Sequence, residues 1–176
     1  MSFSFFGKKE KQAENCAEKN TQINSSEITA SNTGDVLILE NIQIGQKSVS
    51  KEEAIEMAGQ LLVDSGYVMP EYIDAMKERE KVLSTYIGEG IAIPHGVGAA
   101  KDKIIKTGIS VVQFPEGVVF GEGNKAFLVV GIAGKGNEHM KILTNLAEFI
   151  QEGITIKELF TTEDNMRIFN AFTSKL

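Results

Sequence analysis

The chain has 176 residues, a mass of 19.2 kDa and a hydrophobic fraction of 42%, which suits one compact domain with a short additional segment. Its net charge of -6 argues against a nucleic-acid partner, because such binding depends on a basic face that neutralises phosphates. The single cysteine excludes an internal disulfide, and no apolar run approaches the roughly 20 residues of a membrane span. We therefore expect a cytoplasmic protein without stable membrane insertion, and one that needs no metal or cofactor.

Composition divides the chain near residue 35. Residues 1–35 are rich in Asn, Ser, Thr, Lys and Glu, with few large apolar side chains after Phe6. Such a segment cannot bury enough apolar surface to offset the entropy lost on ordering. We predict a flexible polar N-terminal tail over 1–35 and one folded domain over 36–176.

The first half of this domain is predicted to contain a short strand and two helices. Apolar residues over 36–44 indicate a strand or an extended entry. Ser50 and Glu53 form a capping box, which predicts a helix ending at Gly66. Pro70 is suited to open the second helix, because the first helical position needs no N–H. The expected buried residues are Ala54, Ile55, Ala58, Leu61 and Leu62 in the first helix and Tyr72, Ile73 and Met76 in the second.

The second half is predicted to contain strands followed by helices. The expected elements are a strand over 108–114, a turn over 115–117, an extended segment over 118–120, a central strand over 126–133, and helices over 138–151, 156–160 and 163–172. Asn137 is the expected N-cap of the first of these helices. Its expected buried residues are Met140, Leu143, Leu146 and Phe149 or Ile150. Helices alternating with apolar strands predict an α/β protein built around one sheet.

The two histidines are the candidate reactive groups. Each stands where a predicted strand gives way to a loop or helix, and reactive groups in α/β proteins gather at strand ends. His95 lies between Pro94 and Gly96, where glycine permits another molecule to approach closely. His139 lies in the first turn of a helix, an end that favours anions. A neutral imidazole offers a nucleophilic nitrogen at pH 7, so these residues are chemically suited to accept a phosphoryl group.

Two charged residues are candidates to act with the histidines. Arg79, near the end of the second predicted helix, carries a planar fork of donors that can grip a phosphate. Glu89 lies between two glycines and is placed to orient Arg79 or an imidazole ring. Both also fit a plainer interpretation as solvated surface residues, and a histidine considered alone is more often structural than catalytic.

Other chemistries have less support in the sequence. The histidines lack the spacing of a zinc-binding pair, and no third Cys or His accompanies them. No G-x-S-x-G elbow predicts a serine hydrolase, and residues 134–136 lack the full spacing of a phosphate-binding loop. The residues taken singly leave a phosphoryl acceptor and a structural pair of histidines as open alternatives.

Several motifs, in their order and spacing, carry a resemblance over about four fifths of the chain. Residues 90–96 form the central motif, Gly-Ile-Ala-Ile-Pro-His-Gly. The other matching segments are Lys51–Ile55, Gly66–Tyr72, Arg79–Glu80, Ala100–Asp102, Lys106–Gly108, Pro115–Val118 and Asn137–His139. From about Val36 onward the chain resembles mannitol-type enzyme IIA of the bacterial phosphoenolpyruvate-dependent sugar phosphotransferase system.

The resemblance implies roles for four residues. His95 matches the phosphorylated histidine, with Nε2 as the acceptor atom, and His139 matches a histidine beside it that assists transfer. Arg79 matches an arginine that contacts the active site, and Glu89 matches an active-site acid. The implied donor is the phosphohistidine protein HPr, and the implied acceptor is a cysteine of enzyme IIB in the mannitol permease. The implied fold is a single mixed β-sheet flanked by helices on both faces.

The sequence departs from the family pattern at two positions, and other interpretations remain open. Val97 stands where many relatives have Thr, and Ala99 where many have an acid, which puts a hydroxyl contact to the phosphate in doubt. We expect Arg79, His139 and loop N–H groups to surround the phosphate, and Ile91, Ile93 and Val97 to form a docking rim. The alternatives are a fructose-type domain, or a regulatory module whose phosphorylation state controls a transcription factor or enzyme.

Overall fold

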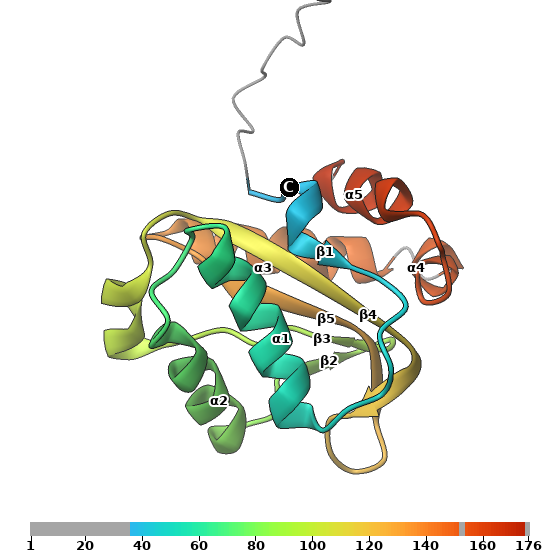
Figure 1. The fold of residues 1–176 in the computed structure, drawn as a ribbon, viewed down its shortest axis with the longest axis horizontal. Helices are drawn as coiled ribbons and strands as arrows, with labels where there is room; N and C mark the ends of the chain where they lie inside the picture. The colour runs from blue at the N-terminus through green and yellow to red at the C-terminus, as the bar shows by residue number, and fades with distance from the viewer. Residues whose placement is uncertain (1–35, 152–153, 175–176) are drawn as a thin grey trace, which may run out of the picture. The chain divides into compact units, whose positions relative to one another are not determined.

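A computed structural model describes residues 36–151 and 154–174, so the predicted tail over 1–35 lies outside the described residues. Five strands form one sheet in the order β1-β4-β5-β3-β2 (Figure 1). The strands are β1 (Ile42–Gln43), β2 (Tyr86–Gly88), β3 (Ile91–Ala92), β4 (Gly108–Val119) and β5 (Lys125–Ala133). The β1–β4 and β3–β5 pairs are parallel, whereas β4–β5 and β2–β3 are antiparallel. The sheet is therefore mixed, as expected.

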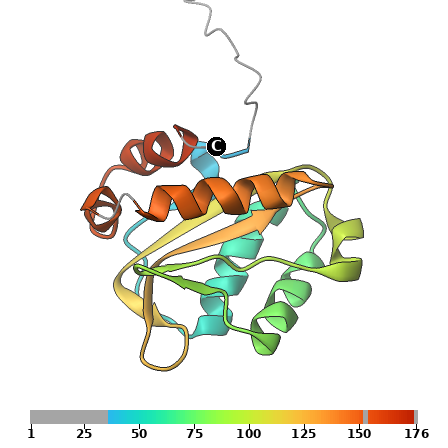
Figure 2. The same ribbon diagram turned by 180° about the vertical axis from the view of Figure 1, so that it is seen from behind.

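Helices cover both faces of the sheet, which confirms the expected fold class. One face carries α1 (Lys51–Asp64) and α2 (Tyr72–Val82), which lie in front of the sheet in Figure 1. The other face packs against α3 (Glu138–Gln151), α4 (Ile154–Leu159) and α5 (Asn165–Thr173), and α3 crosses the sheet in Figure 2. Each face has its own apolar cluster, so β4 and β5 are buried on both sides.

Helix α1 forms as its sequence predicts. The Ser50 hydroxyl accepts from the Glu53 N–H at 3.2 Å, and the Glu53 carboxylate accepts from the Ser50 N–H at 2.9 Å. This reciprocal box satisfies two donors that the first turn would otherwise leave without partners. All five apolar positions expected to be buried are buried. Ser65 is the C-cap, and Gly66 follows with φ of 70°, a conformation that favours glycine.

The turn expected over 115–117 is wrong, because β4 continues through these residues to Val119. The register of β4 against β5 shifts here: Gln113 pairs with Leu128 and Val118 pairs with Ala126, so residues 114–117 lie opposite one residue of β5. The extra residues form a bulge, which accommodates a proline without a donor and Gly117 at φ of 73°. Proline and glycine mark an irregularity in one strand at this point and not the end of it.

Other boundaries differ from the predictions in detail. Residues 36–44 form a 3-10 turn, η1 (Leu39–Asn41), and the short strand β1. Helix α2 begins at Tyr72, after a turn in which the Tyr72 N–H bonds the Met69 carbonyl. Helix α4 begins two residues before its predicted start at 156, and helix α5 begins two residues after its predicted start at 163. Met140 is 64% exposed, contrary to expectation, because Ile142, Leu146 and Phe149 set the buried stripe of α3.

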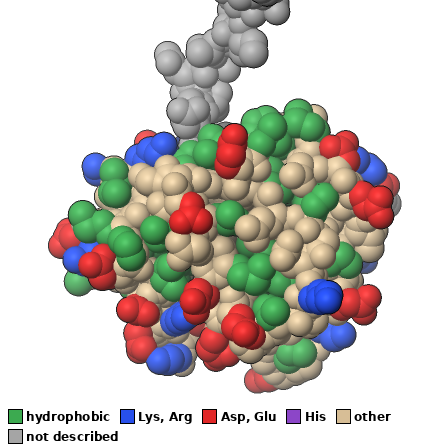
Figure 3. Space-filling model, viewed as in Figure 1, with side chains coloured by type: hydrophobic (Ala, Val, Ile, Leu, Met, Phe, Trp, Pro, Cys, Tyr) green, Lys and Arg blue, Asp and Glu red, His purple; other side chains and the backbone are tan. Residues whose placement is uncertain are grey.

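The described surface agrees with the acidic composition. Lys and Arg side chains are scattered among Asp and Glu on the face drawn in Figure 3, and they form no basic stripe there. No histidine side chain is visible on this face. None of the helices in the described ranges has both the length and the apolar character needed to cross a bilayer.

Candidate functional site

The fold brings the two histidine rings together although 44 positions of sequence separate them. Their ring centroids lie 4.9 Å apart and their planes are inclined by 52°. His95 follows β3 and bridges to Ile132 near the end of β5, whereas His139 follows β5 in the first turn of α3. Because β3 and β5 are parallel neighbours, the segments that leave their carboxyl ends emerge at the same edge of the sheet.

The His95 ring has one nitrogen engaged by the backbone. Its Nδ1 lies 2.7 Å from the Ile93 carbonyl oxygen. A carbonyl can only accept, so this bond requires the hydrogen on Nδ1 and leaves a lone pair on Nε2. His95 is 7% exposed. Burial lowers the pKa of His95, and the nearby Arg79 charge lowers this pKa further. The ring is therefore neutral at pH 7, and Nε2 is the ring nitrogen that carries the lone pair.

His139 is half-buried and is also held neutral. Burial lowers the pKa of His139, and the neighbouring His95 and Lys101 act in the same direction. Lys101 lies in η2 (Gly98–Lys103), a 3-10 segment that sequence reasoning did not connect with the site. The signal was present, since Lys101 belongs to a matching motif. A cation at this place can assist an incoming phosphate.

Tyr72 supports the His95 segment in a way that the sequence did not reveal. Its buried hydroxyl donates to the Ile132 carbonyl at 2.8 Å and accepts from the Gly96 N–H at 2.9 Å. The Ile132 N–H in turn donates to the Pro94 carbonyl at 3.0 Å. The chain on both sides of His95 is thus tied to β5. The Gly96 N–H already has this partner, so the expectation that loop N–H groups surround the phosphate does not extend to it.

Two glycines permit the close packing around the histidines. A Cβ added at Gly96 would lie 2.7 Å from the Tyr72 ring. A Cβ added at Gly134 would lie 2.4 Å from the His139 Cα. Real Cβ atoms do not approach other heavy atoms so closely, so each position needs glycine because of its neighbours.

Arg79 lies in the last turn of α2 and is half-buried. Its Nη1 donates to the Leu83 carbonyl at 2.7 Å, which occupies one of the five guanidinium donors. Its charge acts on His95, which places it in the electrostatic surroundings of the pair. Arg79 also lines a shallow hollow together with Val97, Ala99 and Lys103. The two departures from the family pattern are therefore on the surface beside this arginine.

The expected docking rim is only partly right. Val97 is 49% exposed, whereas Ile91 and Ile93 are buried in the apolar core beneath α3. Their side chains stabilise the sheet and are not available to a visiting protein. Val82 and Leu83, at the end of α2, are exposed apolar residues near Arg79 that sequence reasoning did not single out.

Comparison with known proteins identifies the family. A model of the EIIA 2 family of the phosphoenolpyruvate-dependent sugar phosphotransferase system matches residues 35–175. The chain belongs to this family. It is 51% identical over 138 residues to the mannitol-specific phosphotransferase enzyme IIA component of Bacillus subtilis, covering 77% of this chain and 96% of that protein. It is 50% identical over 125 residues to the mannitol-specific EIICBA component of Escherichia coli, covering 70% of this chain and 20% of that longer protein.

Solved structures agree with this assignment. The crystal structure of IIA mannitol from Escherichia coli superposes with a TM-score of 0.73 at 46% identity, covering 77% of this chain and 98% of that chain. A complex of enzyme IIA and phosphorylated enzyme IIB for mannitol, also from Escherichia coli, matches with a TM-score of 0.74 at 44% identity. It covers 78% of this chain and 97% of the matched chain.

Glu89 is not brought to the histidine pair of this EIIA domain. It has φ of 46° in the turn between β2 and β3, next to Gly90, whose carbonyl accepts from the Phe127 N–H. His95 pairs with Ile132, which lies five residues beyond Phe127 along β5. At 3.3 Å per residue, the Phe127 and Ile132 positions are roughly 16 Å apart, and Glu89 and His95 lie beside these two positions. The role of Glu89 in the site stays a prediction that no described contact supports.

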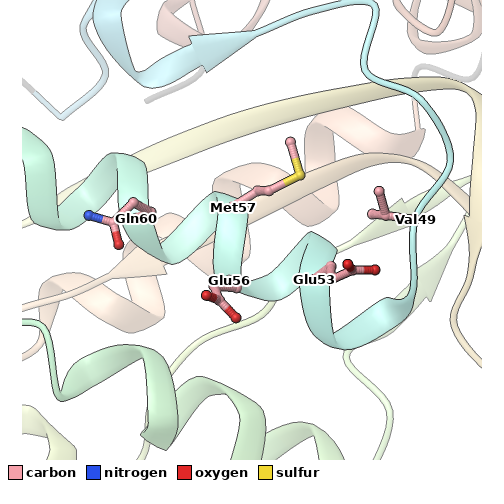
Figure 4. A pocket seen from close by; sticks show the side chains of 5 residues that line it. All are labelled: Val49, Glu53, Glu56, Met57 and Gln60. Carbon is pink, nitrogen blue, oxygen red and sulfur yellow. The ribbon is translucent and has the colours of Figure 1, made fainter.

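A second hollow in the described surface shows no comparable group of reactive side chains. A hollow on the outer side of α1 is lined by Val49, Glu53, Glu56, Met57 and Gln60 (Figure 4). Its carboxylates are already engaged, Glu53 in the capping box and Glu56 with Lys77 at 2.6 Å. This hollow contains neither histidine. Among the described residues, no three His, Cys, Asp or Glu side chains converge on a point where they could hold a metal ion.

Proposed function

We propose that this EIIA domain is a mannitol-specific phosphocarrier that accepts a phosphoryl group on His95 from phosphorylated HPr and passes it to a cysteine of enzyme IIB. The observation that carries the proposal is the neutral His95 ring, whose Nδ1 is bound to Ile93 while its Nε2 lone pair is free beside His139. The mannitol-specific relatives, and the solved complex of IIA with phosphorylated IIB, support the substrate class and the acceptor. This relay operates in the cytoplasm.

The transfer is a displacement at phosphorus in two steps. In the first, His95 Nε2 forms a P–N bond while the P–N bond to HPr breaks, and its electron pair returns to the HPr imidazole. In the second, a thiolate of enzyme IIB forms a P–S bond and Nε2 recovers its electron pair. The cationic side chains of Arg79 and Lys101 balance the charge on the phosphoryl oxygens, and the neutral His139 ring can donate a hydrogen bond to one of them.

The test uses labelled phosphoenolpyruvate with enzyme I and HPr. We expect the wild-type chain to acquire an acid-labile phosphate and His95→Gln to acquire none. The matched variant His139→Gln keeps the acceptor, so it becomes labelled but passes the group to enzyme IIB about tenfold or more slowly. Full labelling of His95→Gln would refute the proposal, and wild-type transfer by His139→Gln would refute the role of His139.

A further inference from the structure

Glu80 is a buried carboxylate that the proposed transfer does not use. It follows Arg79 in α2 and is 4% exposed. Its Oε2 accepts from the Thr85 N–H at 2.7 Å and from the Thr85 hydroxyl at 2.6 Å. Its Oε1 lies 3.3 Å from Lys51 Nζ but has no hydrogen-bond partner. Burying a charge is costly unless it is paired, so this arrangement needs a reason beyond packing.

The contacts of Glu80 continue to the reactive imidazole. The Thr85 carbonyl accepts from the Ile93 N–H at 3.0 Å. The Ile93 carbonyl then takes the hydrogen of His95 Nδ1 at 2.7 Å. The bond to Thr85, which follows α2, fixes the Ile93 backbone, and the next residue is a proline with no N–H to add a further bond. Three consecutive bonds thus link a buried charge to the nitrogen that decides the tautomer.

Glu80 also acts on the protonation of His95 through its charge. Arg79 disfavours the protonated ring, whereas Glu80 favours it, and both stand on α2. His139 faces the ring from α3, and Lys51 of α1 faces Glu80 itself. Glu80 therefore offsets part of the positive charge that Arg79 brings to the site. Without this offset the imidazole would be a weaker base and a weaker nucleophile.

We propose that Glu80 is a positioning residue for phosphoryl acceptance: through Thr85 and Ile93 it holds the His95 ring with the hydrogen on Nδ1 and with Nε2 free. The inference rests on the proposed function of His95. It requires no contact between Glu80 and the phosphate. It predicts that the tautomer of His95 depends on a side chain 15 positions earlier in the sequence.

The test is Glu80→Gln in the full chain, with two measurements. Nitrogen-15 NMR of the His95 ring reports which nitrogen carries the hydrogen, and rapid-quench labelling by phosphorylated HPr reports the rate of acceptance. We expect a new population with hydrogen on Nε2, a titration midpoint for His95 below that of the wild type, and acceptance slowed about tenfold, because a neutral amide oxygen accepts the two Thr85 bonds more weakly than a carboxylate does. Thr85→Val, which removes only the hydroxyl bond, should shift the tautomer in the same direction by less.

Lys51→Met is the matched control, because it removes the ion pair and leaves the bonds from Glu80 to Thr85. We expect a wild-type tautomer and rate from it. The inference is overturned if Glu80→Gln keeps the wild-type tautomer and rate, or if Lys51→Met reproduces its effects. Both outcomes are distinct from labelling of His95→Gln, which would refute the proposed function while leaving the NMR result interpretable. Should Glu80→Gln fail to fold, Thr85→Val decides, and an unchanged tautomer there counts against the inference.

Discussion

Burial of the His95 ring controls its protonation state. Burial is the first cause of its lowered pKa, and the bond from Nδ1 to Ile93 opposes that effect. The bond also removes the ambiguity between two tautomers that a free imidazole has. A ring that is neutral and has its hydrogen fixed on Nδ1 meets an incoming phosphorus with a lone pair already in place. In the transfer that we propose, the residue would be prepared for attack before any partner binds.

The Tyr72 hydroxyl is expected to matter for stability more than its size suggests. Burial raises the pKa of Tyr72 to about 12, so it stays a phenol and a donor throughout the physiological range. Tyr72→Phe would leave the Ile132 carbonyl and the Gly96 N–H without this partner. We expect the free energy of unfolding, measured by urea denaturation, to fall by roughly 1–3 kcal/mol.

Tyr86→Phe is the matched control, because it deletes the same atom. Among the described residues, the bond of the Tyr86 hydroxyl is to one backbone group, the Gly90 N–H at 3.1 Å, in a half-buried position. A smaller loss of stability is expected there. Equal losses in the two variants would contradict the view that Tyr72 bridges two buried backbone groups.

At the scale of elements, the loop between β5 and α3 determines where His139 lies. Gly134 lies against the first turn of α3, where an added Cβ would meet the Cα, Cβ and N of His139 at 2.4, 2.5 and 2.7 Å. Gly134→Ala should therefore push the start of α3 away from His95. We expect a loss of about 1–3 kcal/mol in the free energy of unfolding and slower onward transfer to enzyme IIB.

Gly136→Ala, in the same loop, separates crowding from backbone strain. Nothing lies within 4 Å of its added Cβ, although its φ is 62°. This variant should lose only about 1 kcal/mol through strain and keep the wild-type transfer rate. A Gly134→Ala protein that transfers as fast as Gly136→Ala would show that the position of His139 is not set by this loop.

The sequence predicts elements well where one residue type has one structural meaning. The capping box at Ser50 and the start of α3 at Glu138 are both where local chemistry places them. The prediction of a turn over 115–117 is wrong because proline and glycine fit a bulge as well as a turn, and only pairing with β5 decides between them. The predicted burial of Met140 is wrong for a similar reason, since α3 has apolar residues on more than one side and packing against the sheet buries the side with Ile142, Leu146 and Phe149.

In the site, too, local features could be predicted from the sequence, whereas contacts between distant segments could not. The two histidines could be named from the sequence as residues at strand ends, and their proximity was implied by the family resemblance and not by the residues alone. The hydrogen bonds of Tyr72 and Glu80 could not be predicted, because each joins segments whose separation in space the sequence does not give. The place of Glu89 along the sheet likewise depends on the β3–β5 register.

At the scale of the whole molecule, the buried histidines link stability to pH. Burial lowers the pKa of both below the ordinary value of 6.5. Between these lowered pKa values and 6.5, the unfolded chain binds protons that the folded chain does not bind. The free energy of unfolding is therefore highest above pH 6.5 and falls as the pH drops through this window. The expected fall is on the order of 1 kcal/mol for each unit by which a pKa is lowered.

Urea denaturation between pH 7.5 and 5 measures this fall, and the composition makes the assignment clean because the chain holds only two histidines. The pKa of Glu53 is lowered by hydrogen bonds from Ser50, so its contribution is lost at still lower pH, below its ordinary value of 4.5. The double variant His95→Gln, His139→Gln should lose most of the slope between pH 7 and 5. If that variant keeps the wild-type slope, the proton-linked instability originates elsewhere and the neutral, buried imidazole pair is not its source.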